Sequence, residues 1–147
     1  MKSLSSTQKA YIAGFLDGDG SIYVRLKPND TYRYGFQIAP YIVLFQSIKE
    51  RSKFENICAL IGLGYIRDRK DGILEYTIGR EDSIRSFLKM VKQYLILKKE
   101  QANLIIEILD MKKKVKNRND FDALMKTIDR FRELSYSKKR KFRTLTP

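Results

Sequence analysis

The chain has 147 residues, 43% of them hydrophobic, which is enough to bury one core, so we expect a single domain over residues 1–147. Thirty lysines and arginines against 17 acidic residues give a net charge of +13, which favours a polyanionic partner, nucleic acid before an anionic membrane surface. A basic surface that binds nothing is the alternative. Histidine is absent, so a histidine base, a histidine metal ligand and a serine–histidine pair are excluded.

The single cysteine, Cys58, lies between two apolar residues, and we interpret it as a small buried side chain that forms no intrachain disulfide. No apolar run reaches the length of about 18 residues that a membrane-spanning helix needs, and the start of the chain lacks the apolar region of a signal peptide. We therefore expect a soluble protein with no membrane partner.

The first third of the chain predicts a helix followed by two strands. Residues 5–15 form an amphipathic helix that follows a Ser-Ser-Thr cap and ends near Asp17. Residues 21–29 alternate in polarity, with Ile22, Val24 and Leu26 on one face, and are predicted as a strand. A turn follows, and residues 34–46 are predicted as a second strand with a bulge or an edge at Pro40, because proline cannot donate a ladder hydrogen bond.

The rest of the chain predicts a second helix, a hairpin and three further helices. Residues 49–60 form a helix closed by Gly62, and residues 65–78 form a hairpin that turns at Asp71-Gly72. Helices are then predicted over 83–94, 98–111 and 121–134, followed by a basic tail at about 135–147. The fold class is α+β, with a four-stranded sheet that helices cover on one face.

The uncovered face of this sheet collects long polar and basic side chains at alternate positions of adjacent strands. A solvated sheet face is the simple explanation, but such side chains are also what a β-ribbon needs to contact base edges in a major groove. The residues on this face are Tyr23, Arg25, Lys27, Asn29, Gln37, Tyr65, Arg67, Arg69, Glu75 and Thr77.

Two aspartates and two glycines alternate at the end of the first helix, in Asp17-Gly18-Asp19-Gly20. This composition is typical of a turn. A carboxylate at a helix C-terminus is not stabilised by the helix dipole, however, and carboxylates with a freed backbone carbonyl are ligands that suit Mg²⁺. In a phosphate-binding chain without histidine, a metal held by acids is a route to phosphodiester hydrolysis.

The stretch IAGFLDGDG, Ile12 to Gly20, resembles the nine-residue signature of the LAGLIDADG homing endonucleases. GSIYVRLKPN, GYIRDR and LKKEQANLII also resemble the single-motif members found in organelle introns, in the same order over residues 7–110. The resemblance implies the α-β-β-α-β-β-α fold, with an antiparallel four-stranded DNA-binding sheet.

The resemblance further implies a homodimer, because only one motif occurs in the chain and single-motif members pair their motif helices across a two-fold axis. Ala13, Gly14 and Asp17 would lie at this interface, with Asp17 in a structural role at the helix end. Asp19 would be the metal-binding carboxylate and the Gly18 carbonyl an additional ligand, with one Asp19 from each copy at the centre.

The implied activity is Mg²⁺-dependent hydrolysis of both strands of a long, pseudo-palindromic double-stranded DNA target, which leaves staggered 3′ overhangs. Mn²⁺ should substitute for Mg²⁺, Ca²⁺ should support binding without cleavage, and no small-molecule cofactor is expected. Catalytic roles fall to Asp19 and to three residues that match family positions around the centre, Gln46, Arg51 and Lys98. Each of these three also has a simple explanation, as a strand end, a solvated helix residue and a cation at a helix start.

Further DNA contacts are expected beyond the polar face of the sheet. The outward positions Ala39, Val43 and Phe45 are apolar, which indicates contacts to thymine methyl groups or water-mediated gaps. Tyr32 in the first turn is a further candidate. Phosphate contacts are assigned to Lys139, Arg140 and Lys141 and to the run from Lys112 to Lys116, although a solubilising charged surface is the alternative for both.

An intron RNA maturase or a non-cleaving nucleic-acid-binding module on the same fold is the competing interpretation. Such a protein could lose the central acids, so the intact Asp17-Gly18-Asp19-Gly20 argues for the endonuclease. Composition rich in Lys, Ile, Tyr and Phe, without a transit peptide, fits a chain encoded in a chloroplast or mitochondrial intron.

Overall fold

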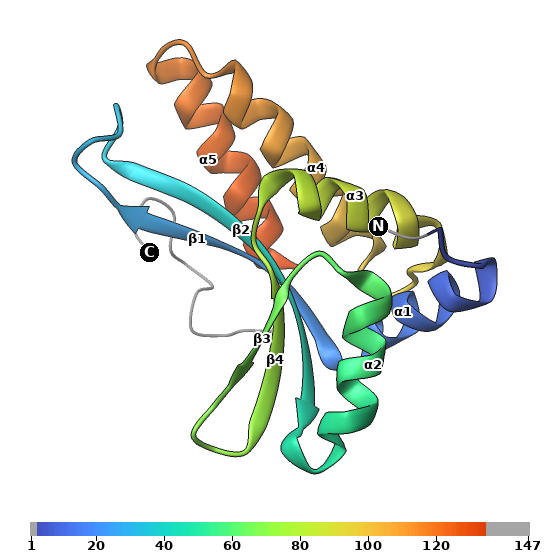
Figure 1. Cartoon of the computed structure of the whole chain (residues 1–147). Coiled ribbons are helices and arrows are strands. Elements are labelled where there is room, and N and C mark those ends of the chain that lie inside the picture. Colours follow the sequence, from blue (N-terminus) through green and yellow to red (C-terminus); the bar gives the residue numbers. More distant parts are fainter. Residues whose placement is uncertain (1–2, 135–147) are drawn as a thin grey trace. The chain divides into compact units, whose positions relative to one another are not determined.

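The computed structural model describes residues 3–134 and shows an α+β fold (Figure 1). Its four strands form one antiparallel sheet in the order β1-β2-β4-β3, which confirms the predicted fold class. Within the described residues, no helix is both long and apolar enough to span a membrane. The elements are α1 (Ser6–Asp19), β1 (Gly20–Pro28), β2 (Phe36–Ser47), a 3₁₀ turn (Ile48–Glu50), α2 (Arg51–Ile61), β3 (Tyr65–Asp68), β4 (Ile73–Ile78), α3 (Glu81–Val91), a second 3₁₀ turn (Lys92–Tyr94), α4 (Lys99–Lys114) and α5 (Arg118–Glu133).

The chain divides into two compact units. Unit 1 comprises Met1–Ile22 and Tyr41–Lys99, and unit 2 comprises Tyr23–Pro40 and Glu100–Pro147. Strands β1 and β2 each contribute residues to both units. The prediction of a single domain is not tested by this division and stays a prediction.

In unit 1, α1 packs against α3 and buries Ile12, Ala13 and Leu16. A capping box starts α1: Gln8 N–H donates to Ser5 Oγ (3.1 Å), and Ser5 N–H donates to Gln8 Oε1 (3.0 Å). In Figure 1, α1, α2 and α3 lie on the same side of β4. The amphipathic first helix was therefore predicted correctly, with its start at the Ser-rich cap.

The predicted end of this helix was wrong by two residues. Helix α1 continues through Asp17 and Gly18 to Asp19, and Gly20 enters β1 directly with extended backbone (φ −128°, ψ 176°). Asp17-Gly18-Asp19-Gly20 is therefore not a turn, although its composition is typical of one. Gly20 is required for space, because a Cβ there would lie 2.8 Å from the Leu16 carbonyl oxygen.

The predicted hairpin is confirmed as β3 and β4. Tyr65 pairs with Thr77 and Arg67 with Glu75, and Gly72 supplies the positive φ of 84° that the turn needs. On β4, Leu74, Tyr76 and Ile78 are buried, and Glu75 and Thr77 point to the other face. Gly62 closes α2 in the left-handed conformation, as predicted.

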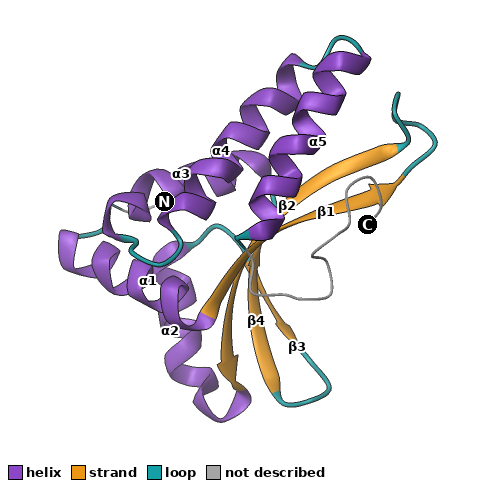
Figure 2. Ribbon diagram, turned by 180° about the vertical axis from the view of Figure 1, so that it is seen from behind, coloured by secondary structure: helices purple, strands orange, loops and turns teal. Residues whose placement is uncertain are grey.

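In unit 2, the alternation predicted for β1 is confirmed, because Val24 and Leu26 are buried while Arg25 is exposed. Helices α4 and α5 lie side by side, as Figures 1 and 2 show. The start of α5 lies three residues before its predicted position. Asn117 caps it by accepting a hydrogen bond from Asp120 N–H (2.8 Å), a signal that the apolar periodicity alone did not reveal.

Pro40 lies inside β2 without a break in the burial pattern: Ile38, Pro40, Ile42 and Leu44 are all buried. No bulge is seen in that pattern. Strand β4 pairs with β2 only from Ile42 to Ser47, so Pro40 lies beyond the reach of β4 and interrupts no hydrogen bond to it.

The C-terminal end of α1 is fixed by a distant segment of unit 1. The Asp17 carboxylate accepts three backbone hydrogen bonds, from Ile96 and Leu97 at Oδ2 (2.8 and 3.1 Å) and from Lys98 at Oδ1 (3.1 Å). In return, Lys98 Nζ donates to the Asp17 carbonyl oxygen (2.9 Å). One of the carbonyls that a helix end leaves without an intrahelical partner is thereby satisfied by a cation.

Replacement of Asp17 by alanine should lower the free energy of unfolding by about 1–2 kcal/mol, because three backbone donors lose a charged acceptor. Urea unfolding followed by circular dichroism measures the loss. Glu55→Ala removes an exposed carboxylate of the same unit that forms a long ion pair with Arg51 (3.8 Å), should change stability by less than about 0.5 kcal/mol, and serves as the control. Equal stability of the two variants would contradict the role given to Asp17.

Burial of Cys58, which is 4% exposed, raises the pKa of its thiol from 9.0 to about 12, with Glu55 adding a smaller contribution. Below pH 9 the thiol is protonated in both the folded and the unfolded chain. Above pH 9 the unfolded thiol loses its proton while the folded thiol keeps it, so Cys58 should lower the free energy of unfolding by up to about 1.4 kcal/mol per pH unit. Urea titrations between pH 8.5 and 10.5 should show a shallower fall in Cys58→Ala, and equal slopes would show that the thiol is not buried as described.

Candidate functional site

Asp17 and Asp19 differ sharply in their surroundings, although both belong to the last turn of α1. The Asp17 carboxylate is used by the chain itself. Asp19 is exposed, and its carboxylate makes no hydrogen bond or ion pair with any described residue. Gly18 is also exposed, and its carbonyl is one of the last four of α1, which lack intrahelical partners. These two neighbouring oxygen ligands are therefore free to bind a cation.

One copy of the chain does not build a complete metal site from acidic, cysteine and histidine side chains. Among residues 3–134, no group of three or more such side chains is arranged to hold a metal ion. Hard divalent cations prefer oxygen ligands, and Mg²⁺ commonly uses one or two carboxylates and several waters. The Asp19 carboxylate and the Gly18 carbonyl fit that chemistry as a partial site that needs a second contributor.

The exposed face of α1 carries glycines that the chain itself does not require. A Cβ added at Gly14 or at Gly18 would meet nothing within 4 Å, and neither residue has a positive φ. Glycine inside a helix costs about 0.5–1 kcal/mol relative to alanine, so a reason outside the single chain is needed. Among the large apolar side chains that this unit exposes are Tyr11 (57%) on α1 and Ile96 (82%) and Leu97 (64%) in the segment bound by Asp17.

The prediction that Ala13 lies at a dimer interface was wrong. Ala13 is 0% exposed and lies on the face of α1 that packs into unit 1. Gly14, one residue further along the helix, is on the exposed face. A step of one residue turns a helix by about 100°, and here that turn separates the buried Ala13 from the exposed Gly14.

Lys98, one of the predicted catalytic residues, forms a hydrogen bond to the acidic end of α1. It is 7% exposed, and its Nζ donates to the carbonyl of Asp17, two residues before Asp19. Gln46 lies at the end of β2, half-buried, with Oε1 accepting from Ser47 N–H (2.8 Å). Neither side chain bonds to the Asp19 carboxylate.

Arg51 is already paired within unit 1. Its guanidinium forms an ion pair with Asp68 at the end of β3 and a longer one with Glu55 (3.8 Å). Because α2 and β3 are far apart in sequence, spacing alone gave no sign of the Asp68 partner. The catalytic role of Arg51 therefore stays a prediction, and the structure adds an acidic competitor for its charge.

The uncovered sheet face of unit 1 is polar and crossed by ion pairs. Arg67 pairs with Glu75 across β3 and β4 (2.7 Å), and Arg69 pairs with Asp71 (2.7 Å) and Glu75 (3.8 Å). Tyr65 is 61% exposed beside them. The guanidinium groups are thus oriented by acids while their outer donors stay accessible, since both arginines are exposed.

Val43 was predicted to contact DNA, and the structure contradicts this. Val43 points to the uncovered face, opposite Thr77, but is only 1% exposed. Strand β2 is an inner strand of the sheet, where a short side chain lies below its longer neighbours. The alternation of the sequence gave the correct face but not the depth of the side chain.

In unit 2, the predicted contacts on β1 and β2 are accessible. Arg25 is exposed, and Tyr23, Lys27, Gln37 and Ala39 are half-buried. The turn between the strands exposes Tyr32 (42%), whereas Asn29 is half-buried, with Oδ1 accepting from Thr31 N–H (3.0 Å) and Oγ1 (2.6 Å). Asn29 therefore shapes the turn as well as facing solvent.

The basic segments give mixed results. Lys112 is half-buried and uses one of its three Nζ donors on the Ile38 carbonyl of β2 (3.2 Å), whereas Lys113, Lys114 and Lys116 are exposed. The phosphate contacts of this run stay a prediction. Lys139, Arg140 and Lys141 lie outside the described residues.

Sequence reasoning also missed the contacts of Arg33, Tyr34 and Phe121, because contacts between residues so far apart in sequence leave no local signal.

Comparisons with known proteins agree with this geometry. The model of the LAGLIDADG endonuclease family matches residues 12–108. The chain is 33% identical to DNA endonuclease I-CreI of Chlamydomonas reinhardtii over 132 residues, which cover 89% of this chain and 80% of the relative. It is 32% identical to DNA endonuclease I-CvuI of Chlorella vulgaris over 116 residues, which cover 79% and 70%.

Two crystal structures of I-CvuI with DNA show the same fold. One contains the I-CreI target in 2 mM Mg, with the DNA not cleaved. This chain superposes on it with a TM-score of 0.84 and 28% sequence identity, and the match covers 91% of this chain and 85% of that chain. The other contains the I-CvuI target in 2 mM Ca, with a TM-score of 0.83, 27% identity and coverage of 90% and 85%. From the match over both units and the motif at the end of α1, we conclude that this chain belongs to the LAGLIDADG endonuclease family.

Proposed function

We propose that the chain is a site-specific homing endonuclease that works as a homodimer and hydrolyses both strands of double-stranded DNA with a divalent metal. The observation that carries the proposal is the end of α1. There the Asp17 carboxylate accepts three internal hydrogen bonds, whereas the Asp19 carboxylate and the Gly18 carbonyl are free at the surface.

DNA as the substrate is supported by charge and by the relatives. The net charge of +13 favours binding to phosphates through counterion release. Each unit presents cationic and polar side chains on its part of the sheet, among them Arg25 in unit 2 and Arg67 and Arg69 in unit 1. I-CvuI, which is similar to this chain, was crystallised with DNA targets.

A homodimer is supported by what a single copy lacks. Each copy carries one signature motif and one free carboxylate, Asp19, at its helix end. The open glycines of α1 would allow a second helix to approach closely, and the exposed Ile96 and Leu97 would be covered on association. A two-fold dimer implies a long target with pseudo-palindromic half-sites.

The metal ligands in this proposal are Asp19 and the Gly18 carbonyl of each copy. When bound, a divalent cation would activate water and stabilise the charge that develops on the phosphate. Mg²⁺ is the expected metal, Mn²⁺ should substitute for it, and Ca²⁺ should support binding without cleavage. With no histidine in the chain, the attacking water must lose its proton to solvent or to a non-histidine group.

In this proposal, the surrounding residues hold the metal ligands and water in place and balance the charge of the phosphate. Lys98 holds the last turn of α1 through the Asp17 carbonyl and places a buried cation near the metal ligands. The half-buried amide of Gln46 would orient water, and Arg51 would balance phosphate charge in competition with Asp68. The products would be staggered 3′ overhangs.

The protein would be encoded in an organelle intron. The relatives from Chlamydomonas reinhardtii and Chlorella vulgaris support this part of the proposal.

Asp19→Asn should lower the cleavage rate at least about 10³-fold and leave DNA affinity within about fivefold, because the change removes a metal-ligand charge from a side chain without internal partners. The substrate is the set of duplexes that wild type selects from a randomised palindromic library, and sequencing of the ends maps the cuts. Asp82→Asn, an exposed carboxylate on α3, is the matched control and should cleave as wild type does.

Loss of folding in Asp19→Asn, measured by circular dichroism, would contradict its assignment to chemistry. Wild type that binds a specific sequence but never cuts it in Mg²⁺ or Mn²⁺ would overturn the endonuclease in favour of an RNA maturase or a non-cleaving binding module.

Gly14→Leu should raise the dimer dissociation constant at least about tenfold, since a side chain at this open position would separate two helices packed across the axis. Sedimentation equilibrium measures the constant. Ser52→Leu places the same side chain on an exposed position of α2 and should leave dimerisation unchanged. A wild-type chain that stays monomeric at micromolar concentration, or a Gly14 variant that dimerises as wild type does, would refute the interface.

A further inference from the structure

The connection between β1 and β2 in unit 2, residues 29–35, forms a closed and well-defined loop, here called the hairpin tip. Asn29 N–H donates to the Gly35 carbonyl (2.8 Å), and Gly35 N–H donates to the Tyr32 carbonyl (2.9 Å). Gly35 supplies a positive φ of 81°. The tip thus has a fixed internal shape, and Tyr32 is exposed on it.

The tip is held from outside by the first turns of α5. The Tyr34 ring stacks on the Phe121 ring at a centroid distance of 4.5 Å and an interplanar angle of 24°. The Arg118 guanidinium lies over both rings, 5.7 Å and 5.5 Å from their centroids. Arg33 Nη1 donates to the Lys116 carbonyl (2.9 Å), just before α5 begins. Aromatic and cationic contacts of this kind are directional, so they fix orientation as well as distance.

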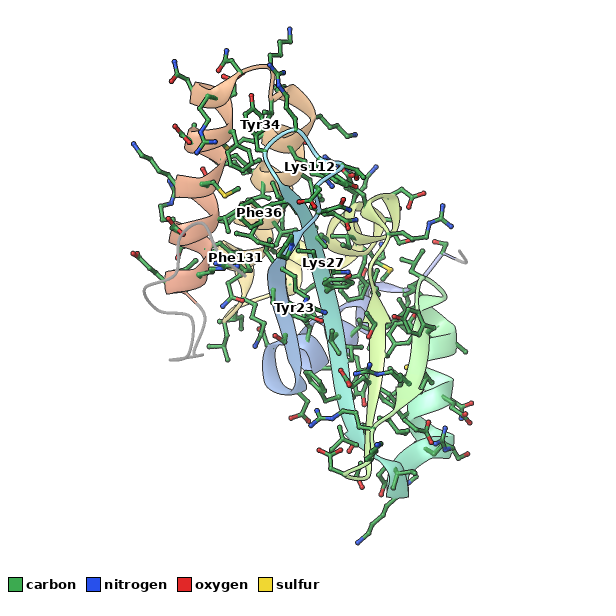
Figure 3. All side chains as sticks on the ribbon, turned by 90° about the vertical axis from the view of Figure 1, so that its left-hand side faces the viewer. Tyr23, Lys27, Tyr34, Phe36, Lys112 and Phe131 are labelled. Carbon is green, nitrogen blue, oxygen red and sulfur yellow. The ribbon has the colours of Figure 1, made fainter. Side chains whose placement is uncertain are left out.

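A second support comes from α4, where Lys112 Nζ donates to the Ile38 carbonyl of β2 (3.2 Å). Figure 3 shows Tyr34, Phe36 and Lys112 at the end of unit 2 that carries the tip, and Phe131 farther along α5. Between these supports lies a pocket of about 220 Å³, which Phe36, Ile38 and Leu124 help to line. Because this space is not filled with packed side chains, the few contacts around it determine where the tip lies.

We propose that Phe121 and Lys112 are specificity-determining positioning residues, which hold the hairpin tip so that Asn29, Tyr32 and Gln37 meet the outermost base pairs of each half-site. This inference rests on the proposed function. Base readout needs donors and acceptors within hydrogen-bond distance of base edges, so a tip released from its supports loses discrimination before it loses phosphate contacts.

The outer position follows from the order of residues along the chain. Strand β1, Gly20–Pro28, begins directly after Asp19, and the tip begins directly after Pro28. In this proposal the tip therefore contacts base pairs farther from the central acids than the residues at the start of β1 do. Residues near the start of β1 would read inner base pairs and should not depend on the supports of the tip.

The test compares sequence preference base pair by base pair in full-length variants. Duplexes with randomised half-sites are selected for binding in Ca²⁺ and sequenced. In Phe121→Ala, discrimination at the outer positions of each half-site should fall at least about fivefold, while the inner positions change less than about twofold. Phe121→Tyr keeps the stacked ring and should restore the wild-type profile.

Phe131→Ala removes the same side chain from the buried face of the same helix and is the matched control. It should lower stability but keep the preference profile. Lys112→Met keeps the aliphatic stem and removes only the amine, so it tests the second support in a variant that does not leave a cavity at the stacked rings. It should relax the same outer positions as Phe121→Ala.

Amide hydrogen exchange in the DNA-free protein provides a readout that does not depend on the proposed function. Exchange within residues 29–35 should rise at least about tenfold in Phe121→Ala and not in Phe131→Ala. The positioning role alone would be overturned if Phe121→Ala and Lys112→Met still bind specific DNA with the wild-type preference at the outer base pairs. It would also be overturned if these variants lose discrimination equally at all base pairs. A wild-type chain that selects no DNA sequence would overturn the proposed function together with this extension.

Discussion

The structure depends on how the last turn of α1 is held. Asp17 accepts hydrogen bonds from three successive backbone amides, and Lys98 returns a hydrogen bond to the Asp17 carbonyl, about 80 residues away in sequence. These contacts keep α1 helical through Asp19, where the local composition favours a turn. They also use up one of the two carboxylates, so that the other is presented at the surface without an internal partner.

In the proposed function, this arrangement makes the metal site depend on dimer formation. At the end of α1, a single copy offers the free Asp19 carboxylate and the neighbouring Gly18 carbonyl, and the described part of the chain has no acidic cluster to complete a metal site. Gly14, Gly18 and the exposed Tyr11 lie on α1, and the exposed Ile96 and Leu97 lie in the segment that Asp17 binds. The proposal that two copies meet there accounts for the free acid, the glycines and the apolar surface with one cause.

Local patterns predicted the elements, but not the contacts between distant residues. Alternation identified β1 and the β3–β4 hairpin because each strand has one buried face. Gly62 correctly marked the end of α2, and Gly72 correctly marked the hairpin turn. The end of α1 was wrong because the partners of Asp17 lie far along the chain. Alternation could not reveal that Val43 is covered or that Ala13 faces inward, because both depend on tertiary neighbours. The roles of Gln46, Arg51 and Lys98 came from the family resemblance, and their contacts, such as Arg51 with Asp68, needed the structure.

The most direct measurement mixes wild type with Asp19→Asn, unfolds and refolds the mixture so that subunits exchange, and records double-strand cleavage against the wild-type fraction. If each copy supplies one essential Asp19, only dimers of two wild-type chains cut both strands, so activity falls with the square of that fraction, to about one quarter in an equal mixture. A linear fall, to about one half, would show that one copy holds a complete site and would contradict the account.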